Sequence, residues 1–200
     1  MKTSNFNTGK TTRFFGLTLA VLLAIGLNAF TVNAQTPFKN VTGSQIKVDG
    51  TSNIHDWTMS ATGFSSEGIC VLNGSQLQDL TALSFALPVT NLKGKDDLLN
   101  TRAHKALKAE LFNKITFKLT NATIESKQKI IKAMGNLTIG GVTKSVTLQA
   151  SYTVDGDEIT FKGSEVLKMS EYSIKPPTFM MGALKVADPV TVNFILKVKN

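Results

Sequence analysis

Hydrophobic and polar residues alternate one by one over most of the chain after residue 40. The clearest example is 135–150, GNLTIGGVTKSVTLQA, where Leu137 and Ile139 alternate with polar neighbours and Val146 and Leu148 do so further on. Successive side chains leave a strand on opposite sides, so a period of two gives one apolar and one polar face. A chain with many such faces and few helices to cover them is expected to curl its sheet on itself.

Glycine-containing dipeptides separate these alternating runs. Gly140-Gly141 joins the two runs of 135–150 and predicts a β-hairpin, whose connection we expect to be longer than a two-residue primed turn. Asp155-Gly156 and Asn73-Gly74 predict further tight turns. The turn signals therefore divide the chain into short, consecutive strands.

The remaining alternating runs predict strands at 46–48, 57–61, 68–72, 83–87, 115–119, 159–161 and 190–198, and 131–133 leads into the first arm of the hairpin. About eight strands separated by turns indicate an all-β fold, an antiparallel barrel or sandwich. Eight strands close into a barrel just wide enough to hold a small ligand.

One segment, 96–111, has helical rather than alternating spacing. Leu99, Ala103, Leu107 and Leu111 recur every four residues, and two aspartates at its start favour the positive end of a helix. We expect one short α-helix here, with His104 outside its apolar stripe and exposed to solvent.

The first 34 residues have the pattern of a secretory signal peptide. Basic residues precede an almost uninterrupted apolar stretch at 14–30, and Val32-Asn33-Ala34 offers small residues for cleavage before Gln35. The alternative, a retained membrane anchor, is disfavoured by the short apolar core. We therefore expect an exported protein with one domain at 35–200.

Cleavage after Ala34 would leave 166 of the 200 residues, enough for one domain with a substantial core. It would remove three basic residues and lower the formal net charge from +8 to +5. The lone Cys70 excludes an internal disulfide, and its apolar neighbours Ile69 and Val71 predict a buried strand thiol.

Signals for catalysis are sparse. The two histidines, His55 and His104, have no partner at metal-ligand spacing, and the sequence has no CxxC, no GxSxG and no phosphate-binding glycine loop. We expect no enzymatic activity, no metal and no cofactor. His55 could be a polar anchor at the mouth of a cavity, or a turn residue satisfied by backbone groups. Trp57, two residues on, could belong to a core or to a ligand wall.

The segment 169–181, MSEYSIKPPTFMM, is irregular. Its two prolines stiffen an extended loop, and Phe179, Met180 and Met181 place adaptable apolar groups together. The segment could contact a flexible ligand, or it could plug one end of a barrel.

Basic residues follow one another on and after the predicted helix. Because the aromatic residues fall mainly on the presumed inner faces, we expect no nucleic-acid binding. A solvated surface is the simpler interpretation, and peripheral contact with anionic lipid headgroups is the second. The residues are Lys105, Lys108, Lys114, Lys118, Lys127, Lys129 and Lys132.

Taken together, several segments resemble the YceI-like family of exported bacterial lipid-binding proteins, over about 38–198. No single segment is decisive, but their order and spacing are specific. They are GTSNIHDW at 50–57, ALKA at 106–109, ITF at 115–117, GNLTIGGVTK at 135–144, IKPPT at 174–178 and MMG at 180–182.

The resemblance implies an antiparallel, lipocalin-like β-barrel with a short helix at its side. It further implies a periplasmic protein that holds a polyisoprenoid or another long-chain amphiphile in an apolar lumen, with His55 as a possible headgroup contact. The candidate ligand-binding residues are Trp57, Phe85, Leu107, Phe117, Leu137, Ile139 and Phe161, with Phe179 and Met180 at one end of the barrel.

The leading hypothesis is therefore a non-enzymatic periplasmic protein that carries, stores or sequesters a lipid. The alternative is an envelope module that binds a protein partner through its surface, which predicts a packed interior and an exposed apolar patch. A third, weaker hypothesis is an enzyme acting on a lipid-like substrate. The sequence leaves the ligand's identity open, and the oligomeric state open between monomer and dimer.

Overall fold

The computed structural model describes residues 2–3 and 35–200, so most of the predicted signal peptide lies outside the described residues. The strands are β1 (Gln35–Asn40), β2 (Gln45–Ser52), β3 (Trp57–Ala61), β4 (Ser65–Asn73), β5 (Gln76–Pro88), β6 (Lys114–Glu125), β7 (Ile130–Ile139), β8 (Val142–Asp155), β9 (Glu158–Lys168), β10 (Thr178–Phe179) and β11 (Leu184–Lys199). The helices are α2 (Asp97–Ala106) and the 3₁₀ turns η1 (Val89–Asn91), η2 (Met169–Tyr172) and η3 (Met180–Gly182).

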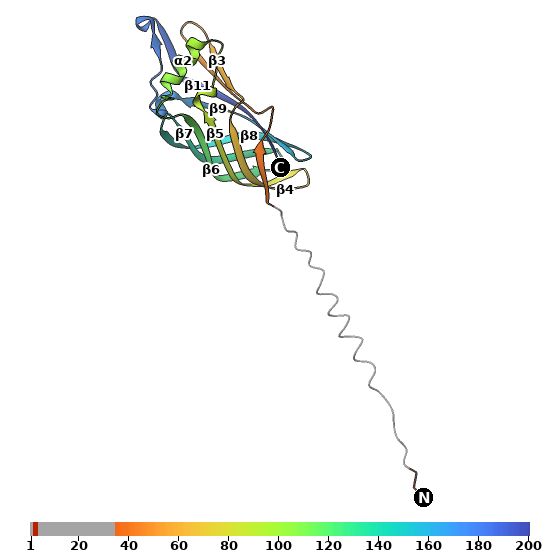
Figure 1. Ribbon diagram of the computed structural model, residues 1–200. Coiled ribbons are helices and arrows are strands. Elements are labelled where there is room, and N and C mark those ends of the chain that lie inside the picture. The colour runs from red at the N-terminus through yellow and green to blue at the C-terminus, as the bar shows by residue number, and fades with distance from the viewer. Residues whose placement is uncertain (1, 4–34) are drawn as a thin grey trace. The chain divides into compact units, whose positions relative to one another are not determined.

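Eight antiparallel strands form a closed ring, in the order β1, β4, β5, β6, β7, β8, β9 and β11 (Figure 1). The ring closes where β1 pairs with β11, with Lys39 opposite Lys199 and Asn40 opposite Val198. The predicted antiparallel eight-stranded barrel with one α-helix is confirmed.

The strands that make up this ring differ from those that alternation indicates. Strand β1 is absent from the sequence prediction, because Pro37 and the polar residues around it interrupt the alternation. Strands β2 and β3 lie outside the ring: β2 pairs with the first part of β11, and β3 extends the sheet beyond β2. The free edge of β3 meets the chain after η1, where Ser60 and Lys93 exchange two backbone hydrogen bonds of 2.8 and 2.9 Å.

The hairpin around Gly140-Gly141 corrects one expectation. Ile139 pairs directly with Val142, so the connection has two residues and is not longer, as predicted. Gly140 and Gly141 both have positive φ, +55° and +83°, which matches a primed turn. The alternation lapses after the glycines because the β8 residues there are polar, and the strand itself is continuous.

Helix α2 begins as predicted but ends early. Asp96 is its N-cap, and the carboxylate accepts a hydrogen bond of 2.8 Å from the Leu99 amide. The helix stops at Ala106 because Lys108 takes a left-handed conformation, with φ of 55°. Leu111, which the spacing assigned to the apolar stripe, is therefore exposed.

The barrel is packed with side chains at the end opposite α2, where the C-terminus lies (Figure 1). Phe38, Leu77, Tyr152, Ile159 and Val198 form the buried cluster there. Cys70 belongs to it as the predicted buried thiol, and burial raises the pKa of that thiol. Within the described part of the chain, no helix is long and apolar enough to cross a membrane.

The barrel lumen as a candidate ligand site

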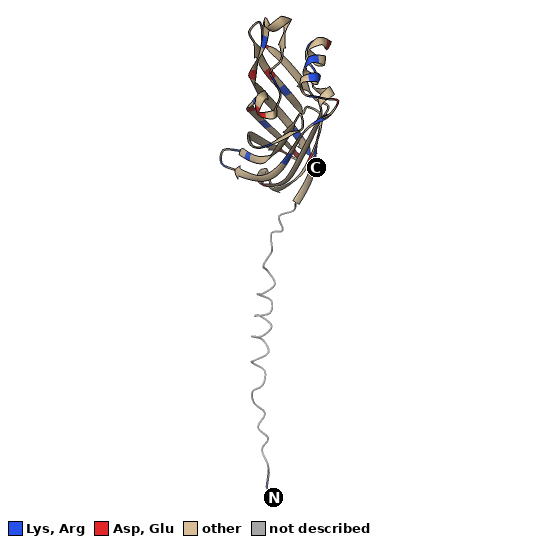
Figure 2. Ribbon diagram, turned by 90° about the vertical axis from the view of Figure 1, so that its left-hand side faces the viewer, with Lys and Arg blue, Asp and Glu red and all other residues tan. Residues whose placement is uncertain are grey.

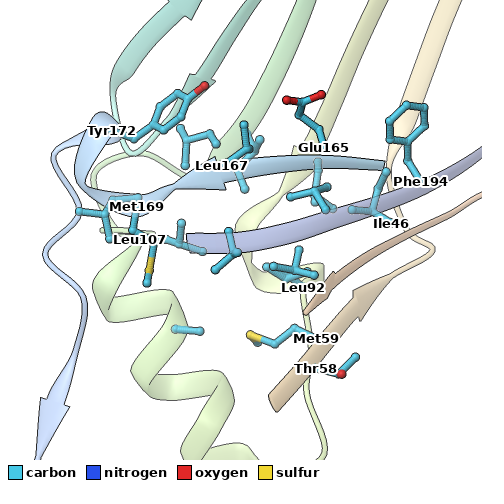
Figure 3. A pocket seen from close by; sticks show the side chains of 18 of the residues that line it. Ile46, Thr58, Met59, Leu92, Leu107, Glu165, Leu167, Met169, Tyr172 and Phe194 are labelled. Atoms are coloured by element: carbon cyan, nitrogen blue, oxygen red, sulfur yellow. The ribbon is translucent and has the colours of Figure 1, made fainter. Parts of the chain in front are cut away.

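A cavity of about 690 Å³ occupies the rest of the barrel interior. Its floor includes Phe38, Ile131 and Phe161, each 5% exposed or less. At the other end its wall includes the exposed residues His55 and Leu98, so the cavity opens beside α2. The volume lies within the range of about 300–1,000 Å³ typical of small-molecule sites. Figure 3 shows part of the wall, which is mainly aliphatic and aromatic.

The structure brings nearly all of the predicted ligand-binding residues together in this wall. Met180 is the exception: it does not line the cavity, and its side chain is 72% exposed. Binding of a ligand at these positions remains a prediction. The predicted residues found in the wall are Trp57, Phe85, Leu107, Phe117, Leu137, Ile139, Phe161 and Phe179.

Inward-facing glycines leave room for aromatic rings to lie against the wall. Phe194 on β11 pairs with Gly163 on β9, and a Cβ at position 163 would lie 2.3 Å from the Phe194 ring. A Cβ at position 135 would likewise lie 2.4 Å from the ring of Phe117. Aromatic rings commonly cover glycines of neighbouring strands in this way. The lumen is therefore lined by these rings without being filled by them.

Three segments distant in sequence form the mouth. The loop after β2 is tied to the chain before β11, because the Asn53 side chain donates to the Ala183 carbonyl at 2.8 Å and accepts from the Lys185 amide at 2.7 Å. Helix α2 contacts β10 through Arg102, whose guanidinium carbon lies 3.9 Å from the centre of the Phe179 ring. This contact places Phe179, which was predicted to lie at one end of the barrel, against the helix.

Both interpretations of His55 have a counterpart in the structure. Its backbone closes a turn, since the Ser52 hydroxyl donates to the His55 carbonyl at 2.7 Å and accepts from the His55 amide at 3.1 Å. Its exposed side chain lies at the mouth of the cavity. Two residues on, Trp57 lines the wall with a buried indole Nε1 that has no hydrogen-bond partner within the described residues.

His104 was expected to be exposed to solvent, and the structure shows otherwise. Its ring is half-buried, and Nε2 lies 2.9 Å from the carbonyl oxygen of Leu92. The contact joins α2 to the chain after η1, so His104 helps to hold the helix over the barrel. In the described ranges, no three His, Cys, Asp or Glu side chains gather as a metal site would require.

Among the polar residues of the wall that the sequence analysis missed are Glu165 and Tyr172. Glu165 lies on the inward face of β9, four residues after Phe161. Tyr172 is buried, and burial together with the nearby charges of Glu171 and Glu165 raises the pKa of its phenol. The period of two from Phe161 to Glu165 could have identified the carboxylate, whereas Tyr172 lies in an irregular segment with no such signal.

Basic side chains do not form one patch. Figure 2 shows Lys and Arg distributed over the strands and helix α2. Several of them pair with acids on the outer face, as in Lys132 with Glu125 at 2.6 Å and Lys197 with Glu158 at 3.1 Å.

A closed antiparallel barrel with an apolar lumen, open at one end, defines a class of proteins that can enclose a small apolar molecule. The sequence matches the YceI-like domain over residues 23–198, and the chain belongs to this family. A comparison with curated proteins found no match.

Solved structures share the fold at low sequence identity. BcnA of Burkholderia cenocepacia is 18% identical with a TM-score of 0.65, over 78% of this chain and 96% of its own. A polyisoprenoid-binding domain from Saccharophagus degradans, implicated in plant cell wall breakdown, is 12% identical with a TM-score of 0.62, over 83% and 99%. A Campylobacter jejuni YceI protein is 17% identical with a TM-score of 0.53, over 61% and 74%.

Proposed function

We propose that this protein binds the hydrocarbon chain of a polyisoprenoid or another long-chain amphiphile inside the barrel, without catalysis. The observation that carries the proposal is the cavity of about 690 Å³ with its largely apolar wall. Membership of the YceI-like family and the likeness to a polyisoprenoid-binding domain support a binding role.

The driving force would be removal of the chain from water. Burial of apolar area contributes about 25 cal/mol per Å², so a tail that loses roughly 400 Å² gains about 10 kcal/mol. Association and ordering of a flexible chain cost several kcal/mol of this. The surplus is sufficient for stable binding without any covalent or metal contact.

We also propose that the mouth of the barrel contacts a lipid surface, from which the ligand enters and leaves. Large apolar side chains are exposed on the three segments that form the mouth. They are Ile54 at 58% exposure, Leu98 at 59%, Met180 at 72% and the fully exposed Met181. Lys95 and Arg102 line the same mouth and would face anionic headgroups. Together with the predicted signal peptide, this favours a periplasmic protein that exchanges lipid with a membrane.

The alternative of a protein-binding envelope module shares only part of this description. It predicts an exposed apolar patch, which the mouth provides, but also a packed interior, which the cavity argues against. An open lumen under the patch is better suited to a lipid than to a protein partner.

The proposal is tested by native mass spectrometry and organic extraction of the mature protein purified from its own host. A stoichiometric long-chain lipid is the expected result. Protein that is empty and also rejects added polyprenols would favour the partner-binding module instead.

A matched pair of variants locates the ligand. Ala133 is buried in the cavity wall, whereas the next residue on β7, Met134, faces outward and is 45% exposed. Ala133→Trp should fill the lumen and abolish binding of the lipid, and Met134→Trp should leave binding unchanged. Thermal unfolding of both variants would verify that each is folded.

A further inference from the structure

One carboxylate lies in the otherwise apolar wall of the barrel's central part. On β9, Glu165 faces the lumen with Phe161 and Leu167, while Lys162, Ser164 and Val166 between them face outward. Figure 3 shows the Glu165 carboxylate with Leu167 on one side and Phe194 on the other.

The neighbouring strands provide no polar partner at this level. Glu165 pairs with Val192 on β11, Val192 pairs with Val48 on β2, and Val48 pairs with Met59 on β3. All of these residues line the cavity. Glu165 is thus the single charged member of a row that crosses four strands.

The basic residues of the wall are engaged elsewhere or lie at the rim. Among residues 35–200, the Glu165 carboxylate takes part in none of the ion pairs. Arg102 rests on the Phe179 ring, and the Lys168 side chain is exposed. The phenol of Tyr172 lies near enough to be influenced by the charge of Glu165, and a phenol is neutral at physiological pH.

A carboxylate facing an apolar cavity is unfavourable unless it is hydrogen-bonded or paired with a positive charge. A ligand can supply that partner if its polar group donates a hydrogen bond. A ligand with an anionic group at the same level would place two negative charges together in a medium of low dielectric constant, which is strongly unfavourable.

We propose that Glu165 receives the polar head of the ligand and selects amphiphiles whose head donates a hydrogen bond, such as an alcohol, an amide or a protonated amine. Carboxylate and phosphate heads are disfavoured. This inference rests on the proposed lumen function and sharpens it, because it favours a free polyprenol or an amine over a polyprenyl phosphate.

The test compares three probes with the same chain: dodecan-1-ol, dodecylamine and dodecanoate, each below its aggregation concentration. Trp57, the single tryptophan of the chain, lines the cavity and reports binding through its fluorescence. The alcohol and the amine should bind the unaltered protein at least about tenfold more tightly than dodecanoate. Glu165→Gln, which keeps the shape of the side chain, should reduce the ratio of amine to dodecanoate affinity by about tenfold or more.

Glu171→Gln is the matched control, because it removes the same charge from an exposed carboxylate that does not line the cavity. It should keep the preference of the unaltered protein. Equal ratios in Glu165→Gln and Glu171→Gln would overturn the role of Glu165. Equal binding of all three probes by the unaltered protein would also overturn it while leaving the lumen function intact. Failure of every probe to bind would overturn the lumen function itself.

Discussion

The indole ring of Trp57 lies directly against Gly50, its cross-strand partner on β2. A Cβ atom at position 50 would come within 2.1 Å of the ring atom Cζ2, much closer than real Cβ contacts. Gly50 is therefore the residue that lets the ring lie against the sheet. Gly163 and Phe194 are related in the same way. In both pairs a glycine, which has no side chain, lets a large ring lie flat against the sheet and leaves space in the lumen.

Gly50→Ala should displace the Trp57 ring from the β2–β3 sheet. Overpacking of this kind typically costs about 1–3 kcal/mol of unfolding free energy. The displaced ring should also enter the lumen and weaken ligand binding. Urea unfolding and the emission maximum of Trp57 would measure the two effects.

The matched background for this test is Trp57→Phe, because phenylalanine lacks the outer ring that meets position 50. Gly50→Ala should lower the free energy of unfolding clearly less in Trp57→Phe than in the unaltered protein. The difference between the two losses is the coupling energy of a double-mutant cycle. Equal costs in both backgrounds would show that the added methyl group acts on the strand and not on the ring.

Local alternation predicted most of the strands, and with them an antiparallel barrel or sandwich, because a strand with one buried face must repeat every two residues. The choice of a barrel and of its lumen residues came from the family resemblance. Phe117, Leu137 and Phe161 lie on alternating runs and were candidates through the resemblance, and all three line the cavity. The same rule places Glu165 inward. Only the structure shows that its carboxylate lines the cavity, because a polar residue does not continue the apolar alternation on which the prediction depends.

Other features depend on contacts that no local pattern contains. The ring closes because Lys39 near the start of the domain pairs with Lys199 near its end. The first strand is not recognisable from alternation, because Pro37 interrupts it. The early end of α2 depends on a left-handed Lys108, a conformation that lysine seldom adopts. Tertiary contacts rather than local preference determine both.

Arg102→Gln should accelerate release of a bound ligand. The guanidinium of Arg102 lies over the Phe179 ring at 3.9 Å and joins α2 to β10 across the mouth. A cation–π contact at an exposed site contributes about 0.5–1 kcal/mol, so its loss should raise the dissociation rate roughly two- to fivefold. Stopped-flow displacement monitored by Trp57 fluorescence would give that rate.

Lys105→Gln is the control for Arg102→Gln, since it removes the same charge from an exposed position on α2. Its dissociation rate should equal that of the unaltered protein. An equal acceleration in both variants would attribute the effect to net charge rather than to the contact with Phe179.

Asp188→Asn should reduce the loss of unfolding free energy that occurs as the pH falls from about 7 to about 3. The Asp188 carboxylate accepts hydrogen bonds from the hydroxyl and the amide of Ser170, at 2.6 and 2.7 Å, and these bonds lower its pKa. Because the folded pKa lies below the unfolded value of about 4, the stabilisation is present above that pH and is lost as the pH falls through the folded pKa. Urea unfolding from about pH 7 to pH 3 would measure the slope.

Ser170→Ala provides the complementary change, because it removes the hydroxyl donor and keeps the amide. Like Asp188→Asn, it should reduce the loss of unfolding free energy at acid pH, but by a smaller amount. If unfolding free energy falls as steeply with decreasing pH in Asp188→Asn as in the unaltered protein, other carboxylates cause the acid sensitivity.

The triple variant Leu98→Ser, Met180→Ser, Met181→Ser should lose affinity for lipid vesicles if the mouth contacts a membrane. Burial of one such side chain contributes roughly 1.5–3 kcal/mol, so co-sedimentation with phosphatidylglycerol vesicles should weaken by at least about tenfold. Val166→Ser is the control, because Val166 is 61% exposed on the outward face of β9 and does not line the cavity. It should co-sediment as the unaltered protein does. An equal loss in the control, or no co-sedimentation of the unaltered protein, would contradict docking through the mouth.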